Sequence, residues 1–447
     1  MATNTDILTL DSHGRCDPFV AYEFACQYLV EGLTSPGRRR AELGGRAFLV
    51  SRGEGAYLYD LQGQRYIDLN AGHGGALVGH SHPAIRAALL QGIEMGVLCG
   101  QETVIPSLVA RRIHDMVPCA ERVRLMFTGT EATALAVRMA RALTGKLKIV
   151  KFEGHYHGQN DPLQFNIQPP LEKAGPRNAP NVLGDSAGLI PELPNYIRIL
   201  PWNDLELFED LLKRESDQIA GVIMEPINYN CGGIMPRPGY LEGVRTLTRQ
   251  YGVVLIFDEI LSGFRTGPDC AQGYLGVTPD LTTLGKALGG GLPIAAVVGK
   301  KDVMDTLAPA GEVINQGTYY GQVLVMHAAK AFLDLAADPA NWARQEQLGQ
   351  RLYKGLDELF ARHHMGHIQA VGNRFGMFFG VDEPVWEYRE AAKIDRELQF
   401  RFYKAAFDHG VYFMHSWHHG YSWAHTEKDI DDALAGIEAS MRDAVRK

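Results

Sequence analysis

The middle of the chain alternates short apolar runs with segments that carry a helical pattern. Three such runs occupy residues 148–152, 220–224 and 253–257, and most of their side chains are apolar. Strands buried on both faces read as continuous apolar runs, and helices between them supply the crossovers that parallel strands require. The pattern therefore predicts an α/β fold, with a mainly parallel sheet covered on both faces in a large domain.

One predicted strand leads directly into a helix with strong terminal signals. Residues 124–127 run through a Thr-Gly-Thr turn into an alanine-rich segment, which has Glu131 in its first turn and ends at a glycine. The backbone N–H groups of Gly129 and Thr130 would then lie at a helix N-terminus, where they can bind a phosphate group. A plain helix N-cap is the alternative interpretation of this turn.

The length of the chain and a change of pattern along it indicate more than one domain. At 447 residues the chain exceeds what one small core can hold. Residues 55–69 are typical of two short strands around an Asp-Leu-Gln-Gly turn. We expect an N-terminal segment over residues 1–70 that packs with the small domain, a large cofactor-binding domain over residues 71–325, and a C-terminal small α+β domain over residues 326–447. The last one should end in an amphipathic helix over residues 429–446.

Composition excludes several classes of function. The net charge of −8 and the isoelectric point near 6.1 give no overall field that would attract nucleic acid or an anionic membrane. The six cysteines are scattered without a Cys-x-x-Cys pair, which indicates free thiols in a reducing compartment. Residues 1–10 lack the features of a secretory signal, and no apolar stretch is long enough to span a bilayer. We expect a cytoplasmic protein.

Lys286 and Asp258 are the two residues with the clearest chemical meaning. Lys286 stands among apolar and glycine residues, and Asp258 ends the apolar run of residues 253–257. A lysine amine can form a Schiff base with an aldehyde cofactor, and a carboxylate can keep a pyridine nitrogen protonated, which are the first requirements of pyridoxal 5′-phosphate (PLP) chemistry. Desolvation would lower the pKa of the amine. A solvated loop lysine and an aspartate bonded to loop N–H groups are the alternatives.

Aromatic and imidazole side chains supply further candidates. Tyr156 comes just after a predicted strand, where its ring can lie on a planar cofactor. His155 and His157 beside it have no carboxylate or thiolate partner in the sequence, and we expect no metal site there. Four histidines and two tryptophans within residues 415–425 indicate an aromatic, polar pocket wall, also without metal.

The order of these motifs resembles that of the class III (fold-type I) PLP-dependent aminotransferases. Within that class the chain is most similar to the glutamate-1-semialdehyde aminomutase branch, through residues 276–286 and 424–427. The resemblance extends from about residue 32 to residue 427. The motifs that carry it are residues 128–132, 156–158, 225–226, 258–265, 283–286 and 317–319.

The resemblance implies a role for each cofactor residue. Lys286 would carry PLP and shuttle a proton between the substrate carbon and the cofactor, and Asp258 would pair with the pyridine nitrogen. Tyr156 and Ile260 would flank the two faces of the ring. The remaining implied roles are phosphate binding by Gly129 and Thr130, phosphate binding by Thr318 from the partner subunit of a homodimer, and a position for Glu225 near the ring hydroxyl or a substrate arginine.

Two residues are candidates for substrate binding. Residues 35–38 resemble the Ser-Pro-x-Arg segment with which this branch holds a substrate carboxylate, and the guanidinium fork of Arg38 suits that task. His73 lies where the branch has a Ser-Trp-Gly segment, and residues 414–419 replace a Phe-Glu-Ala segment. The changed pocket wall argues against the aminomutase reaction itself.

We therefore predict a PLP-dependent aminotransferase that works by two half-reactions. Its small-molecule substrates would be a carboxylate-bearing amino acid, with β-, aromatic and D-amino acids as candidates, and a keto acid or aldehyde. An aminomutase, racemase or decarboxylase on the same fold is the alternative. A binding protein without activity is a third class, against which the presence of both Lys286 and Asp258 argues.

Overall fold

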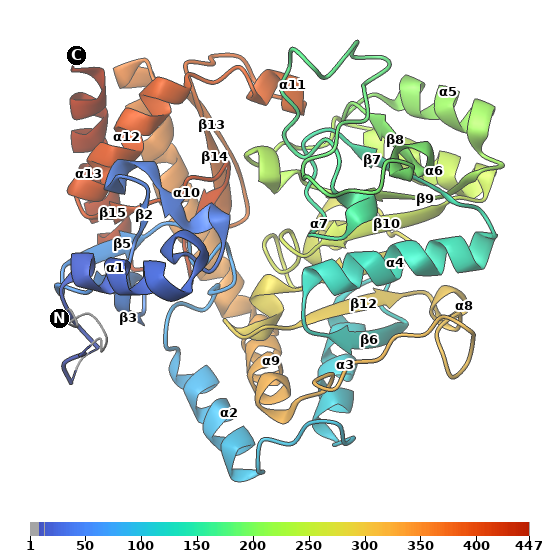
Figure 1. The fold of residues 1–447 in the computed structure, drawn as a ribbon, viewed down its shortest axis with the longest axis horizontal. Helices are drawn as coiled ribbons and strands as arrows, with labels where there is room; N and C mark the ends of the chain where they lie inside the picture. Colours follow the sequence, from blue (N-terminus) through green and yellow to red (C-terminus); the bar gives the residue numbers. More distant parts are fainter. Residues whose placement is uncertain (1–8, 13, 447) are drawn as a thin grey trace.

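The computed structural model describes residues 9–12 and 14–446, so parts of the predicted terminal units, residues 1–8, 13 and 447, lie outside it. Helices surround a large sheet and three smaller ones (Figure 1). The helices are α1 (Pro18–Tyr28), α2 (Pro83–Glu94), α3 (Ile105–Met116), α4 (Gly129–Thr144), α5 (Leu205–Glu215), α6 (Tyr240–Tyr251), α7 (Cys270–Leu275), α8 (Lys301–Met304), α9 (Val323–Ala336), α10 (Pro339–His363), α11 (Tyr388–Ala391), α12 (Arg396–Asp408) and α13 (Glu427–Val445).

The large sheet has seven strands, of which only β12 runs against the others. The mainly parallel sheet predicted from the apolar runs is therefore confirmed, as is the α/β fold class. In spatial order the strands are β6 (Arg122–Met126), β12 (Ala295–Gly299), β11 (Leu281–Leu284), β10 (Val254–Glu259), β9 (Ile219–Met224), β7 (Lys148–Phe152) and β8 (Ile197–Leu200).

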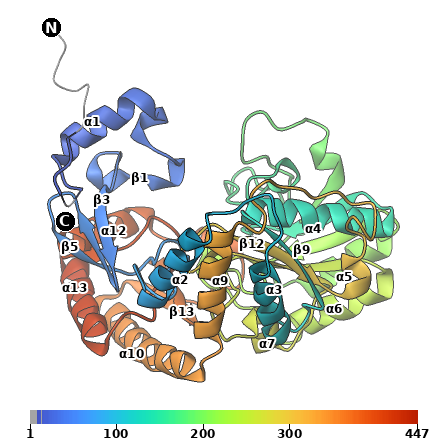
Figure 2. The ribbon, with the colours of Figure 1, turned by 90° about the horizontal axis from the view of Figure 1, so that it is seen from below.

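Both faces of the large sheet are buried by helices. Val254 and Ile256 of β10 pack in one core cluster with α4, whereas Leu255 and Phe257 pack in another with α5 and α6. The alternation follows from the strand period of two, which sends successive side chains to opposite faces. In Figure 2 the sheet is seen with α4 above it and α3 and α6 below it.

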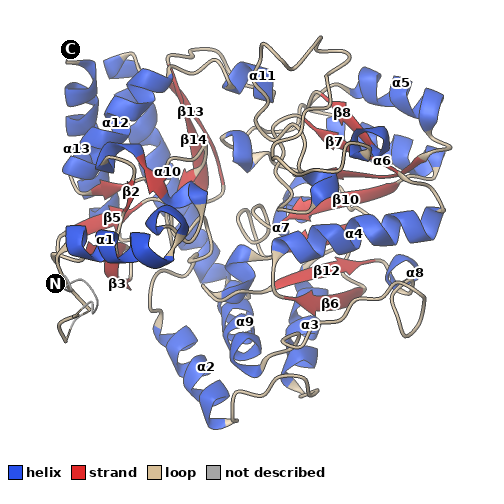
Figure 3. Ribbon diagram, viewed as in Figure 1, coloured by secondary structure: helices blue, strands red, loops and turns tan. Residues whose placement is uncertain are grey.

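The four-stranded sheet brings together an early and a late segment of the chain. The hairpin predicted within residues 55–69 is present as the antiparallel pair β4 (Tyr57–Asp60) and β5 (Arg65–Asp68). β5 also pairs in parallel with β15 (Val411–Tyr412), so early and late segments share one sheet on the left of Figures 1 and 3. The other strands are β3 (Val50–Glu54) of that sheet, β13 (Gly366–Val371), β14 (Arg374–Phe379) and β16 (His419–Gly420) of a three-stranded sheet, and the separate pair β1 (Arg39–Arg40) and β2 (Arg46–Ala47).

The domain boundaries at residues 70 and 325 stay predictions.

None of the helices over the described part of the chain is long and apolar enough to cross a membrane. The C-terminal helix expected from residue 429 begins slightly earlier, because Thr426 and Asp429 form a capping box at the start of α13.

Candidate active site

The predicted cofactor residues lie around a cavity of about 440 Å³ at the carboxyl edge of the large sheet. Tyr156 follows β7, Glu225 follows β9, Asp258 lies near the end of β10 and Lys286 follows β11. Ligands favour this edge of an α/β sheet. Seven of the eight predicted cofactor-binding residues line the cavity: Gly129, Thr130, Tyr156, Glu225, Asp258, Ile260 and Lys286.

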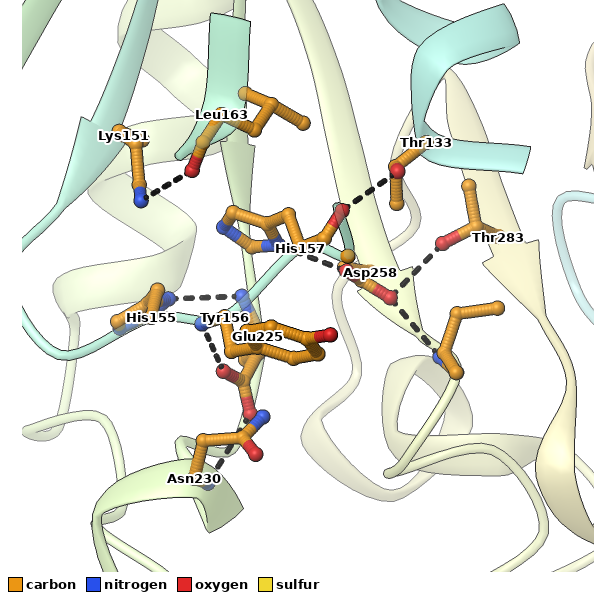
Figure 4. A network of polar contacts seen from close by, with 12 residues as sticks. Thr133, Lys151, His155, Tyr156, His157, Leu163, Glu225, Asn230, Asp258 and Thr283 are labelled. Carbon is orange, nitrogen blue, oxygen red and sulfur yellow. Dashed lines mark hydrogen bonds and ion pairs between the residues drawn. The ribbon is translucent and has the colours of Figure 1, made fainter. Parts of the chain in front are cut away.

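Asp258 is held by three donors (Figure 4). Its Oδ2 lies 2.7 Å from Nδ1 of His157, and its Oδ1 accepts hydrogen bonds from Oγ1 of Thr283 at 2.9 Å and from the backbone N–H of Ile260 at 3.1 Å. Burial lowers the pKa of His157, and the carboxylate opposes that shift. Because a carboxylate has about four acceptor positions, one is left for a further donor in the cavity.

His157 and Thr283 were not identified as functional residues from the sequence. The hydroxyl of Thr133 in turn donates to the carbonyl of His157 at 2.7 Å, which fixes the loop against α4. His157 lies beside Tyr156 in the Tyr-His-Gly motif, and that motif was the only sequence feature that pointed to a role for His157. Its contact with a carboxylate 101 positions away could not be read from a single sequence.

Lys286 projects into the cavity from a strained backbone. Its φ is +44°, which is uncommon for a residue other than glycine and is tolerated mainly where the surroundings enforce it. Desolvation lowers its pKa to about 8, although Asp258 and Glu225 favour the charged form. Among the described residues no group bonds to its amine, so the amine is available to a ligand.

The N-terminus of α4 forms the opposite end of the cavity. Thr128 and Glu131 form a capping box, in which the backbone N–H of Glu131 donates to the hydroxyl of Thr128 at 3.2 Å. The N-cap interpretation of this turn is thus correct, and it is compatible with anion binding. The N–H groups of Gly129 and Thr130 have no acceptor within the part of the chain that is described.

Glu225 is buried between the loops that follow β7 and β9. It accepts hydrogen bonds from the backbone N–H of Tyr156 at 3.0 Å and of Asn230 at 3.4 Å (Figure 4). Burial raises its pKa to about 7. Its contacts therefore fix the loop that carries Tyr156, in addition to lining the cavity.

These groups match what PLP presents. The free amine of Lys286 can meet an aldehyde, the unused acceptor position of Asp258 can meet a protonated ring nitrogen, and the two N–H groups at the start of α4 can meet a phosphate. The side chains of Tyr156 and Ile260 give the cavity ring-sized apolar walls. The residues present therefore fit the cofactor.

A second cavity of about 710 Å³ adjoins the first and shares Tyr156, Asn230 and Lys286 with it. His73 lines it, as expected for a substrate residue, and burial lowers the pKa of that imidazole to about 4. His415 and His418 line it too. No aspartate or glutamate is among its lining residues, all of which belong to the described chain.

Arg38 and Thr318 line neither of the first two cavities. Arg38 bonds to the hydroxyl of Thr34 and lines a third cavity, of about 470 Å³, which shares His73 with the second one. Thr318 is exposed and lines neither of the first two cavities. The single chain thus brings Thr318 to no cofactor group of its own.

The histidines of residues 415–425 divide into two groups. His415 and His418 line the second cavity, whereas His419 and His425 are buried behind it against Tyr403 and Ser422. Burial and the nearby Arg374 hold the pKa of His418 and of His419 well below its usual value. In the expected aromatic, polar wall, His418 is therefore a neutral imidazole, and the buried guanidinium of Arg374 lies behind it.

The sequence of the chain matches a known protein family over most of its length. The family model described as aminotransferase class-III matches residues 41–438. The chain belongs to the class-III aminotransferases. PLP is the cofactor, and the fold is that of the fold-type I PLP-dependent transferases.

Among its relatives, this class-III aminotransferase is 38% identical over 426 residues to glutamate-1-semialdehyde 2,1-aminomutase 2 of Exiguobacterium sp., covering 95% of this chain and 96% of that one. It also resembles the solved ω-transaminase from Sphaerobacter thermophilus, with a TM-score of 0.90, 28% identity and coverage of 95% and 97%. A β-phenylalanine aminotransferase from Variovorax paradoxus gives a TM-score of 0.80, 29% identity and coverage of 93% and 91%.

Proposed function

We propose that this class-III aminotransferase moves an amino group from a carboxylate-bearing amino acid to a keto acid or aldehyde in two half-reactions. The observation that carries the proposal is the contrast between the two adjoining cavities. The first is lined by seven of the eight residues predicted to bind PLP, whereas the second has His73, His415 and His418 on its wall and no lining carboxylate. β-, aromatic and D-amino acids remain candidate donors. The likeness to the ω-transaminase supports the reaction type.

PLP, when bound, supplies an aldehyde that condenses with amines and a ring that withdraws electrons from the substrate carbon. The lowered pKa of Lys286 means that its amine can accept and return a proton near neutral pH. Asp258, oriented by His157 and Thr283, would pair with the ring nitrogen. In the same proposal Gly129 and Thr130 bind the phosphate, Tyr156 and Ile260 flank the ring, and Glu225 lies at its hydroxyl side.

Arg38 and His73 are the proposed substrate residues. His73 lies in the wall shared by the second and third cavities, and Arg38 opens onto the third. The guanidinium of Arg38 can bind the carboxylate of a substrate that extends past His73. This arrangement supports a carboxylated donor.

We also propose a homodimer whose sites are shared. Thr318 is exposed, and Ile314 and Tyr319 beside it are 62% and 60% exposed, an unusual share for apolar side chains of this size. The backbone of Leu98 pairs with Val323, so the exposed apolar residues 97 and 98 belong to the same region. A partner that covers this surface could receive Thr318 at its own phosphate site. The cytoplasmic location stays a prediction, supported by six free cysteines.

An aminomutase is the second candidate, because the relatives with that name are 38% identical to the chain. Incubating the PLP-loaded protein with single amino acids and no acceptor separates the two. Transamination gives a keto product and converts the bound cofactor to its amine form, with a change in its visible spectrum. An isomerised amino compound without a keto product would favour the mutase. Lys286→Ala should abolish either reaction, and absence of a borohydride-fixed cofactor on Lys286 would refute both.

A further inference from the structure

One face of α12 lines the 710 Å³ cavity without any role assigned so far. Arg396, Gln399, Phe400 and Tyr403 are all lining residues, and their spacing of three, four and seven puts them on one side of the helix. The loop with residues 415–418 supplies the facing wall. Lys286 lines the same cavity, so a ligand in contact with this face lies in the compartment that opens onto the cofactor.

Arg396 differs from the other cations of its helix. Arg401 pairs with Glu397 at 2.6 Å and Lys404 pairs with Asp408 at 3.0 Å. Within the described chain Arg396 has no carboxylate within ion-pair distance, and its neighbour Asp395 accepts the N-cap hydrogen bond of α12. The one α12 cation that faces the cavity is thus the one without an anionic partner.

The guanidinium of Arg396 is nevertheless held in place. Its central carbon lies 4.3 Å from the centre of the Trp417 ring, and its Nη1 donates to Oε1 of Gln399 at 3.3 Å. Arg396 is exposed overall, and partial desolvation of its guanidinium lowers its pKa. A stacked guanidinium keeps its remaining N–H groups in a fixed plane, which matches the two oxygens of a carboxylate.

The charges around the cavity favour an anion near this guanidinium. The carboxylate of Glu42 lies behind the cavity wall, with its Oε2 at 2.9 Å from Nε2 of His415. It also forms an ion pair with Arg40. Trp417, Phe400 and Tyr403 form an aromatic surface next to Arg396. The ligand that fits these surroundings has a carboxylate attached to an apolar or aromatic group.

We propose that Arg396, stacked on Trp417 and steadied by Gln399, is a carboxylate-binding residue of the substrate cavity, additional to Arg38. It would bind the carboxylate of the amino donor or of the keto acceptor. This inference rests on the proposed function for its substrate class, but the binding site itself does not depend on which reaction follows.

The test is binding of a ligand that cannot react. The PLP-loaded protein is titrated by calorimetry with 3-phenylpropanoate and, in parallel, with 3-phenylpropanamide, which has the same size and no charge. We expect Arg396→Gln to weaken binding of the acid by about 10- to 100-fold, the range for losing a charge-assisted hydrogen bond, and to leave the amide unchanged. Lys404→Gln removes the same charge from the exposed side of α12 and should change neither affinity.

Two further measurements make the result decisive. The visible absorbance of bound PLP and its loss on heating show whether each variant is folded, and Arg38→Gln is titrated alongside. Equal affinity of the parent and Arg396→Gln for the acid would overturn the proposal, as would a loss confined to Arg38→Gln or no binding of the acid to the parent. A loss in Arg396→Gln supports it even if the donor experiment reveals a mutase, so the two proposals fail separately.

Discussion

At the scale of single residues, the site depends on groups whose protonation is set by their neighbours. Lys286 is desolvated, so its amine loses its proton more readily than a surface lysine does. Three donors surround the carboxylate of Asp258. An amine that loses its proton at about pH 8 therefore stands in the same cavity as this carboxylate, and the pairing suits proton transfer at a carbon next to a cationic ring.

The lowered pKa of Lys286 predicts how the protein takes up PLP. Only the neutral amine attacks an aldehyde, so the attachment rate of PLP to the cofactor-free protein should rise with pH and level off above about 8. An unperturbed lysine would let the rate rise to about pH 10.4. Stopped-flow absorbance across this pH range measures it. A rate that still climbs between pH 9 and pH 10 would contradict the lowered pKa.

His157 is predicted to be a positioning residue for Asp258. His157→Leu removes the 2.7 Å contact to Oδ2, and we expect kcat/KM to fall about 10- to 100-fold, as for the loss of a hydrogen bond to a charged group. His157→Asn keeps an N–H donor near the position of Nδ1 and should recover part of the loss.

The spectrum of the bound cofactor separates this role from a merely structural one. The pH at which its visible absorbance changes should shift in His157→Leu and return toward the parent value in His157→Asn. If both variants lose activity equally and keep the parent titration, Asp258 does not need His157.

At the scale of elements, the proposed phosphate end of the cavity is formed by two segments that fit closely. The loop after β7 passes the start of α4 at Gly158, where φ is +86° and a Cβ atom would lie 2.6 Å from Oγ1 of Thr130. Thr130 in turn accepts a hydrogen bond from the backbone N–H of Gln159 at 3.0 Å. The backbone of Thr130, including its N–H group, can thus keep its position only if residue 158 is glycine.

Gly158→Ala should therefore reduce the affinity for PLP by about tenfold or more, since Thr130 must move and a fixed phosphate contact is lost. Gly188→Ala is the matched control, because Gly188 has a φ of +84° and no atom within 4 Å of its Cβ position. Both variants carry similar backbone strain. Fluorescence titration of the cofactor-free proteins with PLP measures the difference, and equal affinities would argue against a role for this close contact.

The elements also show what the sequence could and could not predict. The strands β7, β9 and β10 were found within one residue at each start, because their apolar runs are buried on both faces. The strand β12 was not predicted, and its reversed direction follows only from its antiparallel pairing with β11 and β6. Likewise Arg396 carries no local motif, and its meaning comes only from the contact with Trp417, which lies on a different element.

At the scale of the whole molecule, the chain joins its two ends in one sheet but does not bring Thr318 to its own cofactor cavity. β5 and β15 join the two ends of the chain in one sheet. Thr318, by contrast, has no place at the phosphate end of its own cavity. The lysine and aspartate motifs could be recognised from sequence because each is local, whereas a residue that acts across an interface can only be assigned by resemblance until a dimer is tested.

Hybrid dimers provide that test. If Thr318 serves the partner's site, a dimer of one Lys286→Ala subunit and one Thr318→Glu subunit has one site with both defects and one site with neither. We expect each variant homodimer to be inactive, since the added carboxylate repels the phosphate, and the purified hybrid to have about half of the parent activity. Two different affinity tags on co-expressed subunits allow the hybrid to be isolated and its PLP content to be measured. An inactive hybrid would mean that Thr318 acts within its own subunit, because both sites would then carry one defect each.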